Sequence, residues 1–459
     1  MALWLNWIEQ PPPKGQVSGS NPLRVTSFNK QWSNYFNTNM NVIIYFTIII
    51  RKDLIMKLCP LFLFFITASI QPMFAQNQAL NITTSLAFHS ESFLGLQNGL
   101  KSSDKGIAKL NIKYDLDDLS SQLAFNYDRY DRSTFDGSYL QYTNGIATYG
   151  VGVIDRHWSF SDKTSLILSH NARPIKSIYL KLKNRFGYDW LPSKANWSFE
   201  AFNGVTERSL NGTNSMLLGA RAILSPIEGL DFELVQTSQW GGKGYSNGIS
   251  ALGAALFFDT NDNSNSNINK MAGFGISYLI PSNIMPLRIY GQAVGEDEAG
   301  SLPSCYAYLA GLEWSNTKIK YPTTVGIEAI DTRIKRTTNG YCGPNTMYNN
   351  GTYDYINYGN TMGAAIDTEG VSLELFGQSQ ISQKINIKYS TKLVTINDKN
   401  WAGHRLSSKR QSGLINLLGA SWNKNNIRFN VNVYNQDFSL DKADIKNSSG
   451  LGFSSSVTF

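Results

Sequence analysis

Three short segments of this chain carry polar side chains of types that could do chemistry. They are Ser169–Ile175, Val294–Trp314 and Tyr358–Gly370. Their ionisable residues include His170, Arg173, Glu296, Asp297, Glu298, Asp367 and Glu369. A proline in the first segment would interrupt the pairing of a strand. Such groups can exchange protons, form ion pairs or hydrogen-bond a ligand, and the structure that holds them decides between these roles.

Catalysis fits the spacing of these residues poorly. Ser169 and His170 are adjacent, and adjacent side chains of a strand point to opposite faces, which hinders the hydrogen bond that would activate a serine. The acids at 296–298 are also neighbours, whereas glycoside cleavage needs two carboxylates that face each other across a bond. The histidines after residue 75 are widely dispersed: His89, His157, His170 and His404. We therefore expect no catalytic residue, no metal site and no cofactor.

A long polar segment, Arg336–Asn360, is rich in glycine, asparagine and tyrosine. Sugars are bound by aromatic faces, which cover their C–H surfaces, and by planar polar groups, which hydrogen-bond their hydroxyls. The segment offers both, and its tyrosines are candidate glycan contacts: Tyr341, Tyr348, Tyr353 and Tyr355. The alternative is a loop that is merely solvated. A second long polar loop is expected at Asp259–Lys270.

The last ten residues, Gly450–Phe459, indicate which fold holds these segments. Leu451, Phe453, Val457 and Phe459 share one parity, and glycine, serine and threonine occupy the other. Because successive side chains of a strand point to opposite faces, this strand has one apolar and one polar face. A final strand that ends on phenylalanine is typical of bacterial outer-membrane barrels, although an edge strand of a soluble sheet would also alternate.

The same alternation recurs along the chain. It is found in Leu110–Leu116, Leu123–Tyr127, Ile178–Leu182, Leu230–Leu234, Ile385–Leu393 and Ile427–Val433. No segment after Gln76 has a convincing helical period, and a mean hydropathy of −0.24 with no long apolar run argues against a helical membrane protein. Strands in lipid must close into a barrel, because every backbone donor and acceptor needs a partner.

The sequence therefore predicts an all-β fold, a closed antiparallel transmembrane β-barrel in the bacterial outer membrane. Residues 76–459 allow roughly 16 to 20 strands, and we predict 18 because an even number returns both termini to the periplasm. Many aromatic residues fall near the predicted strand ends, where barrels carry interfacial girdles. They include Tyr188, Trp190, Trp197, Trp240, Trp314 and Trp422.

The front of the chain carries an export signal. Lys57 and the apolar run Leu58–Ile70, followed by a small residue at Ala75, describe a signal peptide at residues 56–75. Residues 1–55 are interpreted as an upstream extension from a start codon assigned too early, with a small N-terminal domain as the alternative. Without residues 1–75 the chain has a net charge of only +3, since that segment holds six of the 41 Lys+Arg and two of the 34 Asp+Glu. Nucleic acid is therefore not expected as a partner.

Cysteine usage suits an exported protein. Cys59 lies inside the predicted signal, which leaves Cys305 and Cys342 in a compartment where disulfides persist. These two could form a disulfide between loops, or remain apart, because their spacing alone does not place them side by side.

Together, SHNARPI at Ser169–Ile175, the acidic Val294–Trp314 segment and the Gly-spaced Tyr358–Gly370 segment resemble the motifs of the Wzi family, outer-membrane barrels that attach capsular polysaccharide to the cell surface. The resemblance covers essentially all of Gln76–Phe459. It implies a lectin for a secreted acidic polysaccharide, without catalysis, with outer-membrane lipid and polysaccharide export machinery as further partners. Wzi proteins usually carry a periplasmic helical bundle, and the strand pattern of Asn81–Phe88 predicts that this bundle is reduced or absent here.

A barrel of this size encloses a polar interior, in which charged groups pair rather than stay isolated. We expect His170, Arg173, Glu296, Asp297 and Glu298 to form such a network, with Arg173 paired to one of the acids. The network either braces the wall and plugs the lumen or contacts ligand directly. The rival function, a diffusion porin or uptake channel, has the same architecture and differs in having an open lumen.

Overall fold

The computed structural model describes residues 80–94, 106–128, 133–186, 195–209, 212–257, 268–280, 286–299, 302–338 and 342–459. The predicted extension at 1–55 and the signal peptide at 56–75 lie outside these residues, as does most of the predicted loop Asp259–Lys270. Among the described residues, no helix combines the length and the apolarity needed to cross a membrane.

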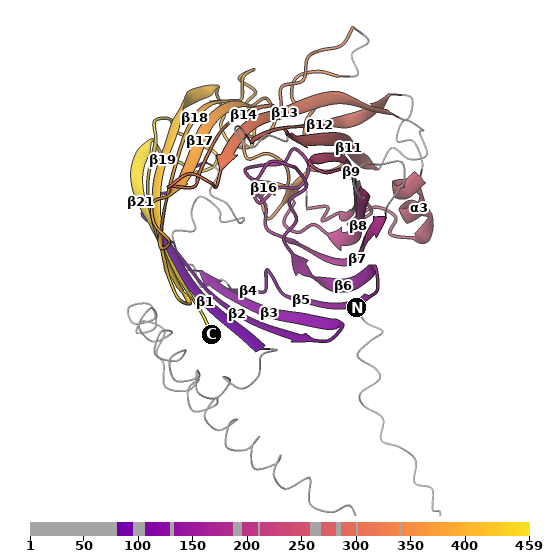
Figure 1. Ribbon diagram of the computed structural model, residues 1–459. Coiled ribbons are helices and arrows are strands. Elements are labelled where there is room, and N and C mark those ends of the chain that lie inside the picture. The colour runs from indigo at the N-terminus through magenta and orange to yellow at the C-terminus, as the bar shows by residue number, and fades with distance from the viewer. Residues whose placement is uncertain are drawn as a thin grey trace, which may run out of the picture. The chain divides into compact units, whose positions relative to one another are not determined.

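Eighteen long antiparallel strands form a closed β-barrel, as the sequence predicted (Figure 1). They are β1 (Leu80–His89), β2 (Gly106–Leu116), β3 (Leu119–Asp128), β5 (Tyr139–Asn144), β6 (Ala147–Ile154), β7 (Ile175–Phe186), β8 (Ala195–Val205), β9 (Met216–Ile227), β10 (Leu230–Trp240), β11 (Asn269–Leu279), β12 (Leu287–Ala299), β13 (Leu302–Asn316), β14 (Thr323–Asp331), β17 (Val371–Gln380), β18 (Ile385–Ile396), β19 (Gln411–Lys424), β20 (Ile427–Gln436) and β21 (Ser448–Thr458). The short elements are β4 (Ser133–Thr134), β15 (Ile356–Asn357), β16 (Asn360–Thr361) and α3 (Ile249–Phe257).

The barrel closes between its first and last strands. β1 pairs with β2 on one side and with β21 on the other, with Phe88 opposite Phe453 and Thr83 opposite Thr458. This seam leaves no unpaired edge, which is the condition for a sheet to cross a membrane.

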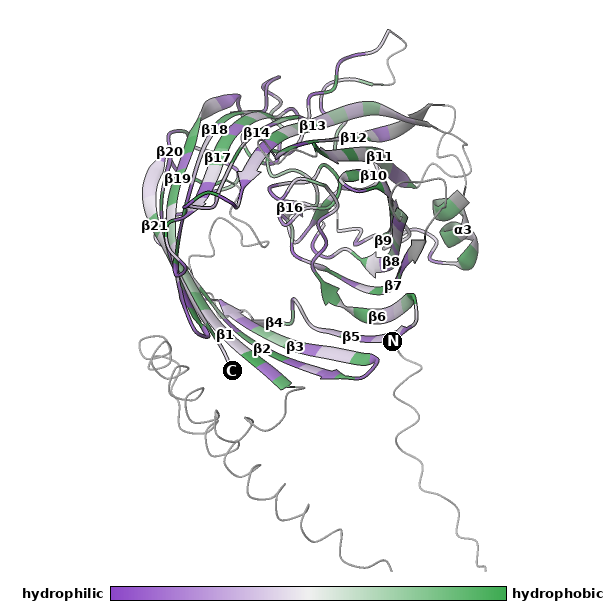
Figure 2. Ribbon diagram, viewed as in Figure 1, coloured by the Kyte–Doolittle hydropathy of each residue, from purple (hydrophilic) through white to green (hydrophobic). Residues whose placement is uncertain are grey.

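The apolar face of each strand points away from the lumen. Leu234 of β10, Ile178 of β7 and Leu451 of β21 are 65%, 63% and 58% exposed, and all belong to the alternating runs noted above. Exposed apolar side chains on nearly every strand form a belt suited to lipid. The hydropathy colouring in Figure 2 changes between green and purple along several strands of the wall.

The connections differ between the two rims. At the rim that holds the C-terminus, tight turns join β2 to β3, β5 to β6 and β19 to β20, with left-handed backbone at Asp117, Gly145 and Asn425. Except between β12 and β13, where only residues 300–301 intervene, the connections at the opposite rim are longer, up to the segment between β14 and β17. Barrels of this class place short turns in the periplasm and long connections outside the cell, so the second rim is the outer one.

Candidate functional site

Two connections of the outer rim fold inward and form a lumen plug, residues 155–174 between β6 and β7 and residues 332–370 between β14 and β17. Figure 1 shows β16 of the plug inside the ring of strands. The amide of Ser169 donates to the carbonyl of Met362 over 2.8 Å and joins the two segments. Apolar side chains of both segments pack with wall residues in one cluster that includes Trp158, Leu166, Ile167, Met347, Tyr355 and Met362. The lumen therefore contains a packed core.

Buried polar contacts attach the plug to the wall strands β7–β14 and β17, here called the filled wall. Arg156 donates through Nε to Glu200 of β8 over 2.9 Å, and Ser161 Oγ donates to Glu328 of β14 over 2.5 Å. A carboxylate taken out of water costs several kcal/mol, at the order-of-magnitude level, unless it is paired. Each of these contacts therefore fixes the position of the plug.

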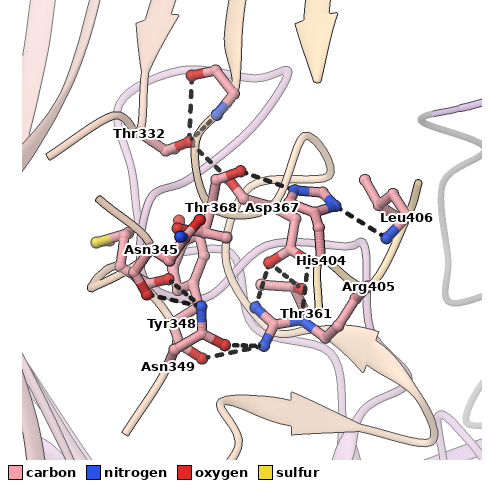
Figure 3. Close-up of polar contacts among 12 residues, drawn as sticks. Thr332, Asn345, Tyr348, Asn349, Thr361, Asp367, Thr368, His404, Arg405 and Leu406 are labelled. Atoms are coloured by element: carbon pink, nitrogen blue, oxygen red, sulfur yellow. Dashed lines mark hydrogen bonds and ion pairs between the residues drawn. The ribbon is translucent and has the colours of Figure 1, made fainter. Parts of the chain in front are cut away.

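Arg405, from the connection between β18 and β19, holds the second plug segment (Figure 3). Its Nε donates to Asp367 over 2.8 Å, and its Nη1 donates to the carbonyl oxygen of Tyr348 over 3.3 Å. Burial opposes the ionisation of Asp367, but the charge and the hydrogen bonds of Arg405 outweigh it, so the pKa of Asp367 is lowered. The neighbouring His404, fully buried, bonds through Nε2 to the carbonyl oxygen of Thr368 over 2.9 Å. Asp367 is thus a structural carboxylate.

His170 of the plug contacts Asp155 through Nδ1 over 2.6 Å and stacks on His157, with ring centroids 4.6 Å apart. The hydrogen bond to Asp155 raises the pKa of His170, whereas burial lowers the pKa of His157. Ser169 Oγ donates to the carbonyl of Gly363 over 2.5 Å. Ser169 and His170 therefore have different partners.

The predicted pairing of Arg173 with Glu296 is wrong, because the described carboxylate partner of Arg173 is Asp136. Arg173 donates through Nε and Nη2 to the two oxygens of Asp136, over 2.7 and 2.8 Å. Glu296 accepts the backbone N–H of Tyr348 over 2.9 Å and anchors a different part of the plug. Asp136 lies 37 residues before Arg173, and only the packing of the plug brings the two together. For the two remaining acids the backbone alone is described, as part of β12: Asp297 and Glu298.

The prediction of glycan-contacting tyrosines is also wrong for three of the four residues. Tyr348, Tyr353 and Tyr355 are 0%, 1% and 1% exposed, so they have no face to offer a sugar. Their hydroxyls donate to backbone carbonyls within the lumen and at its rim, which satisfies the one polar group that burial would otherwise penalise. These carbonyls belong to Leu166, Gly241 and Ile167. The fourth candidate, Tyr341, lies outside the described residues.

Cys305 and Cys342, left open as a possible pair, form a disulfide with the sulfur atoms 2.00 Å apart. It joins β13 of the filled wall to the plug. The plug is therefore tied to the wall covalently as well as by ion pairs.

A tyrosine that the sequence did not single out lies at the outer mouth of the lumen. Tyr358, at the turn between β15 and β16, donates its backbone N–H to the carbonyl of Glu207 over 2.8 Å, and its hydroxyl bonds to the Glu207 carboxylate. The guanidinium carbons of Arg173 and Arg208 lie 3.8 and 5.1 Å from the centre of its ring. Lys176 pairs with Glu207 over 2.7 Å. These five residues are called the mouth site below.

The charges of the mouth site are not balanced. Burial opposes the ionisation of Glu207, but the hydrogen bonds from Lys176 and Tyr358 outweigh it, so the pKa of Glu207 is lowered. Both carboxylate oxygens of Glu207 therefore already have a hydrogen-bond partner, Lys176 for one and Tyr358 for the other. Arg208 is exposed and has no carboxylate within 4 Å among the described residues. Arg208 and Tyr358 both adopt left-handed backbone, with φ of 54° and 53°, a conformation that costs of order 1–3 kcal/mol per residue and is enriched at functional sites.

A cavity of about 550 Å³ adjoins the mouth site and is lined by Arg173, Lys176, Arg208 and Tyr358 together with wall residues of β2 and β3. A second cavity, also about 550 Å³, lies between the plug and strands β1, β2, β12–β14 and β17–β21. Strands β18–β21 and β1–β3 are here called the open wall. Lys109 of β2 lines both cavities and Lys388 of β18 lines the second. Neither lysine has a carboxylate within 4 Å in the part of the chain that the structure describes.

Comparison with known proteins shows the family to which this barrel belongs and the solved structures that have a similar fold. A family model described as capsule assembly protein Wzi matches residues 68–448. The solved carbohydrate-binding outer-membrane barrel Wzi of Escherichia coli has a similar fold, with a TM-score of 0.68, 21% identity, and 85% and 86% of the two chains covered. A Klebsiella pneumoniae protein from a cps region is 27% identical over 186 residues, which span 40% of this chain and 37% of that protein's length. A Rhodopseudomonas blastica porin overlaps with a TM-score of 0.38 at 12% identity, over 83% of this chain and 99% of the porin.

Proposed function

Because the chain belongs to the capsule assembly protein Wzi family, we propose that it binds secreted capsular polysaccharide and anchors it at the cell surface without catalysis. The protein is an integral barrel of the outer membrane. The observation that carries the proposal is the mouth site, where Arg208 has no carboxylate partner among the described residues and lies over the Tyr358 ring beside a polar cavity. In this role the barrel receives the polysaccharide from the export machinery while outer-membrane lipid surrounds its wall.

The mouth site has the chemistry for an acidic sugar. A guanidinium presents several N–H donors in a fixed plane, which matches the two oxygens of a carboxylate. Arg208 can turn this group to a ligand, since its only described contact is with the Tyr358 ring. Lys109 adds a second cation at the wall of the same cavity; among the described residues no carboxylate lies within 4 Å of it, and the charges of Asp136 and Asp155 act on it from further away. The hydroxyls of a sugar would meet the polar side chains of β3 that line the cavity, among them Asn126.

Replacing Arg208 tests the site. Arg208→Ala removes charge-assisted hydrogen bonds worth about 1.5–3 kcal/mol, so polysaccharide binding is expected to weaken roughly 10- to 100-fold. Titration of the purified barrel with acidic capsular polysaccharide at low and moderate salt measures the change. Arg410→Ala is the matched control, because Arg410 is also exposed at the outer rim and pairs with Asp398 over 3.2 Å. Equal affinities for the two variants would remove Arg208 from the site.

The rival function, a diffusion porin or uptake channel, requires a path through the lumen. The plug supports anchoring instead, because it is packed and is attached to the filled wall by ion pairs and a disulfide. Planar-bilayer recording of the purified barrel distinguishes the two. A large steady ionic current would favour the porin and contradict the proposal.

Two further measurements examine anchoring without catalysis. The length distribution of capsular polysaccharide is expected to be unchanged after prolonged incubation with the protein, and shortening would reveal an enzyme. A deletion strain is expected to release polysaccharide into the medium. Surface polysaccharide equal to that of the parent strain would contradict the anchoring role.

A further inference from the structure

The helix α3 lies outside the barrel, against the outward face of the wall. Figures 1 and 2 show it beyond the ring of strands, on the side away from the plug, and mostly in the hydrophobic colour. Its inner side packs on a small apolar cluster of wall residues and its own side chains. The wall residues are Met216 and Leu218 of β9 and Trp240 of β10. All three belong to the parity that faces lipid elsewhere, since Leu217 and Val235 on the other parity are buried in the lumen core.

The helix also presents apolar side chains away from the wall. Ile249 is 90% exposed and Leu256 is 42% exposed. A Cβ added at Gly253 would meet no atom within 4 Å, so this position also faces open space. Residues 249, 253 and 256 are spaced by four and three and therefore form one stripe on the helix surface. The sequence of α3, ISALGAALF, contains no charged residue.

This exposure is not that of a helix in water. A surface helix normally carries charged or polar residues opposite its packed face, and one that is hydrophobic on all sides is found in a core or in a membrane. A helix of nine residues also has little stability of its own and depends on burial. The apolar stripe therefore requires an apolar neighbour.

The position of α3 identifies that neighbour. Met216 begins β9 and Trp240 ends β10, so the helix lies at the outer end of the wall. It covers Trp240, which is only 3% exposed and whose indole N–H donates to Asn203 over 3.3 Å. Leu234, 65% exposed in the lipid-facing belt, lies on the same strand about 20 Å further in. The stripe of α3 thus continues the belt at the level of the lipid interface.

We infer that α3 is an interfacial helix whose stripe of Ile249, Gly253 and Leu256 lies among the acyl chains of the outer leaflet. It takes the place of the aromatic girdle at this point of the rim and thickens the lipid-contacting surface over β9 and β10. The contact is with lipid and is independent of polysaccharide binding.

Fluorescent labelling tests this inference on the full barrel in lipid vesicles. Single cysteines at Ile249 and Leu256 carry an environment-sensitive dye, with Cys59 changed to serine and the native disulfide kept. Leu234→Cys is the control in lipid and Lys243→Cys, at an exposed position just before the helix, is the control in water. The dyes at 249 and 256 are expected to be quenched by nitroxide lipids labelled near the headgroup end of the chain and protected from aqueous cobalt. The dye at 234 is expected to be quenched best by labels deeper in the chain.

Two results would overturn the inference. Cobalt quenching at 249 and 256 equal to that at 243 would place the stripe in water. Protection from both quenchers, or protection that falls as the protein is diluted in lipid, would show a second copy of the chain on the stripe. Because all four substituted side chains point away from the packed protein, the variants are expected to fold, and retained heat-modifiable migration on gels checks this.

Discussion

The filled wall and the open wall of the lumen use charged residues in opposite ways. Buried carboxylates of the filled wall are ion-paired or hydrogen-bonded. Glu233 of β10, which is 1% exposed, lies 2.6 Å from Arg221 of β9, and Glu328 of β14 accepts hydrogen bonds from Ser161 and Tyr290. In the open wall Lys109 and Lys388 face cavities and have no carboxylate within 4 Å among the described residues. The filled wall therefore holds the plug through paired charges, whereas the open wall also leaves two cationic groups, Lys109 and Lys388, beside cavities.

This difference teaches how one sheet can be both a support and a binding surface. Inward positions alternate along every strand, so the backbone treats both walls alike. The two walls differ in whether a polar side chain of the plug reaches the inward-facing residues of the strands. Where it does, burial makes pairing obligatory. Where it does not, Lys109 and Lys388 line cavities that have room for water.

The largest effect is expected from loosening the plug at Arg405. Arg405→Leu leaves Asp367, 1% exposed, as a buried carboxylate without its cation, and the free energy of plug opening is expected to fall by about 3–5 kcal/mol. Hydrogen exchange of residues 342–370 measures this quantity. Arg410→Leu on the same connection is the control, and its exposed pair with Asp398 predicts a loss of about 1 kcal/mol or less. A loss as small for Arg405→Leu would show that the plug is held by packing alone.

Removing the disulfide is expected to have the next largest effect. Replacing Cys305 and Cys342 with serine releases the plug from β13 and is expected to cost about 2–4 kcal/mol. The same exchange experiment should show faster opening near residue 342 and little change in the open wall. Uniform destabilisation of both walls would contradict the division between them.

Two lysines of β18 compare an ion-paired cation at the border of the filled wall with a cation that faces a cavity. Lys392 pairs with Glu374 over 2.6 Å, whereas Lys388, four residues earlier on the same face of the strand, has no carboxylate within 4 Å among the described residues. Lys392→Met is expected to lower stability by about 1–3 kcal/mol because it weakens the pairing of a buried carboxylate. Lys388→Met should leave the thermal midpoint unchanged and alter only the ion selectivity of any residual conductance. Equal midpoints for both variants would break the comparison.

The smallest effect concerns pH. The contact with Asp155 raises the pKa of His170, so its stabilisation is complete below the ordinary histidine pKa of 6.5 and is lost as pH rises through the raised value. The side chain is 31% exposed, so the contribution is expected to be below about 1 kcal/mol. Subtracting the pH dependence of His170→Gln from that of the native protein isolates this contribution from the opposite slope of His157, whose pKa burial lowers. A difference that grows with rising pH would contradict the assignment.

Much of the fold could be predicted from local pattern. The alternating runs at Ile178–Leu182 and Leu230–Leu234 became lipid-facing strands, because the two faces of a strand meet different solvents and select residues accordingly. The prediction failed for α3, Ile249–Phe257. That helix is apolar on both faces, since wall and lipid are both apolar, and it therefore lacks the polar face on which a helical period depends.

The candidate site was less predictable. Tyr348 and Tyr355 are of a residue type that often contacts sugars. They are buried, however, because the loop folds into the lumen instead of extending from it. Arg208 carries no local signal at all. Its role depends on Tyr358, which is 150 residues away in sequence and is brought close only by the plug.

The sequence by itself determined that the chain forms a closed barrel whose last strand, Ser448–Thr458, meets its first. That result follows from alternation and from the need to pair every backbone group in lipid, both of which are local rules. Only the tertiary structure decided which charged groups meet. Arg173 found Asp136 and Arg405 found Asp367 because the plug folds back through the lumen, and pairing of buried charges depends on distance in space, which sequence spacing does not encode.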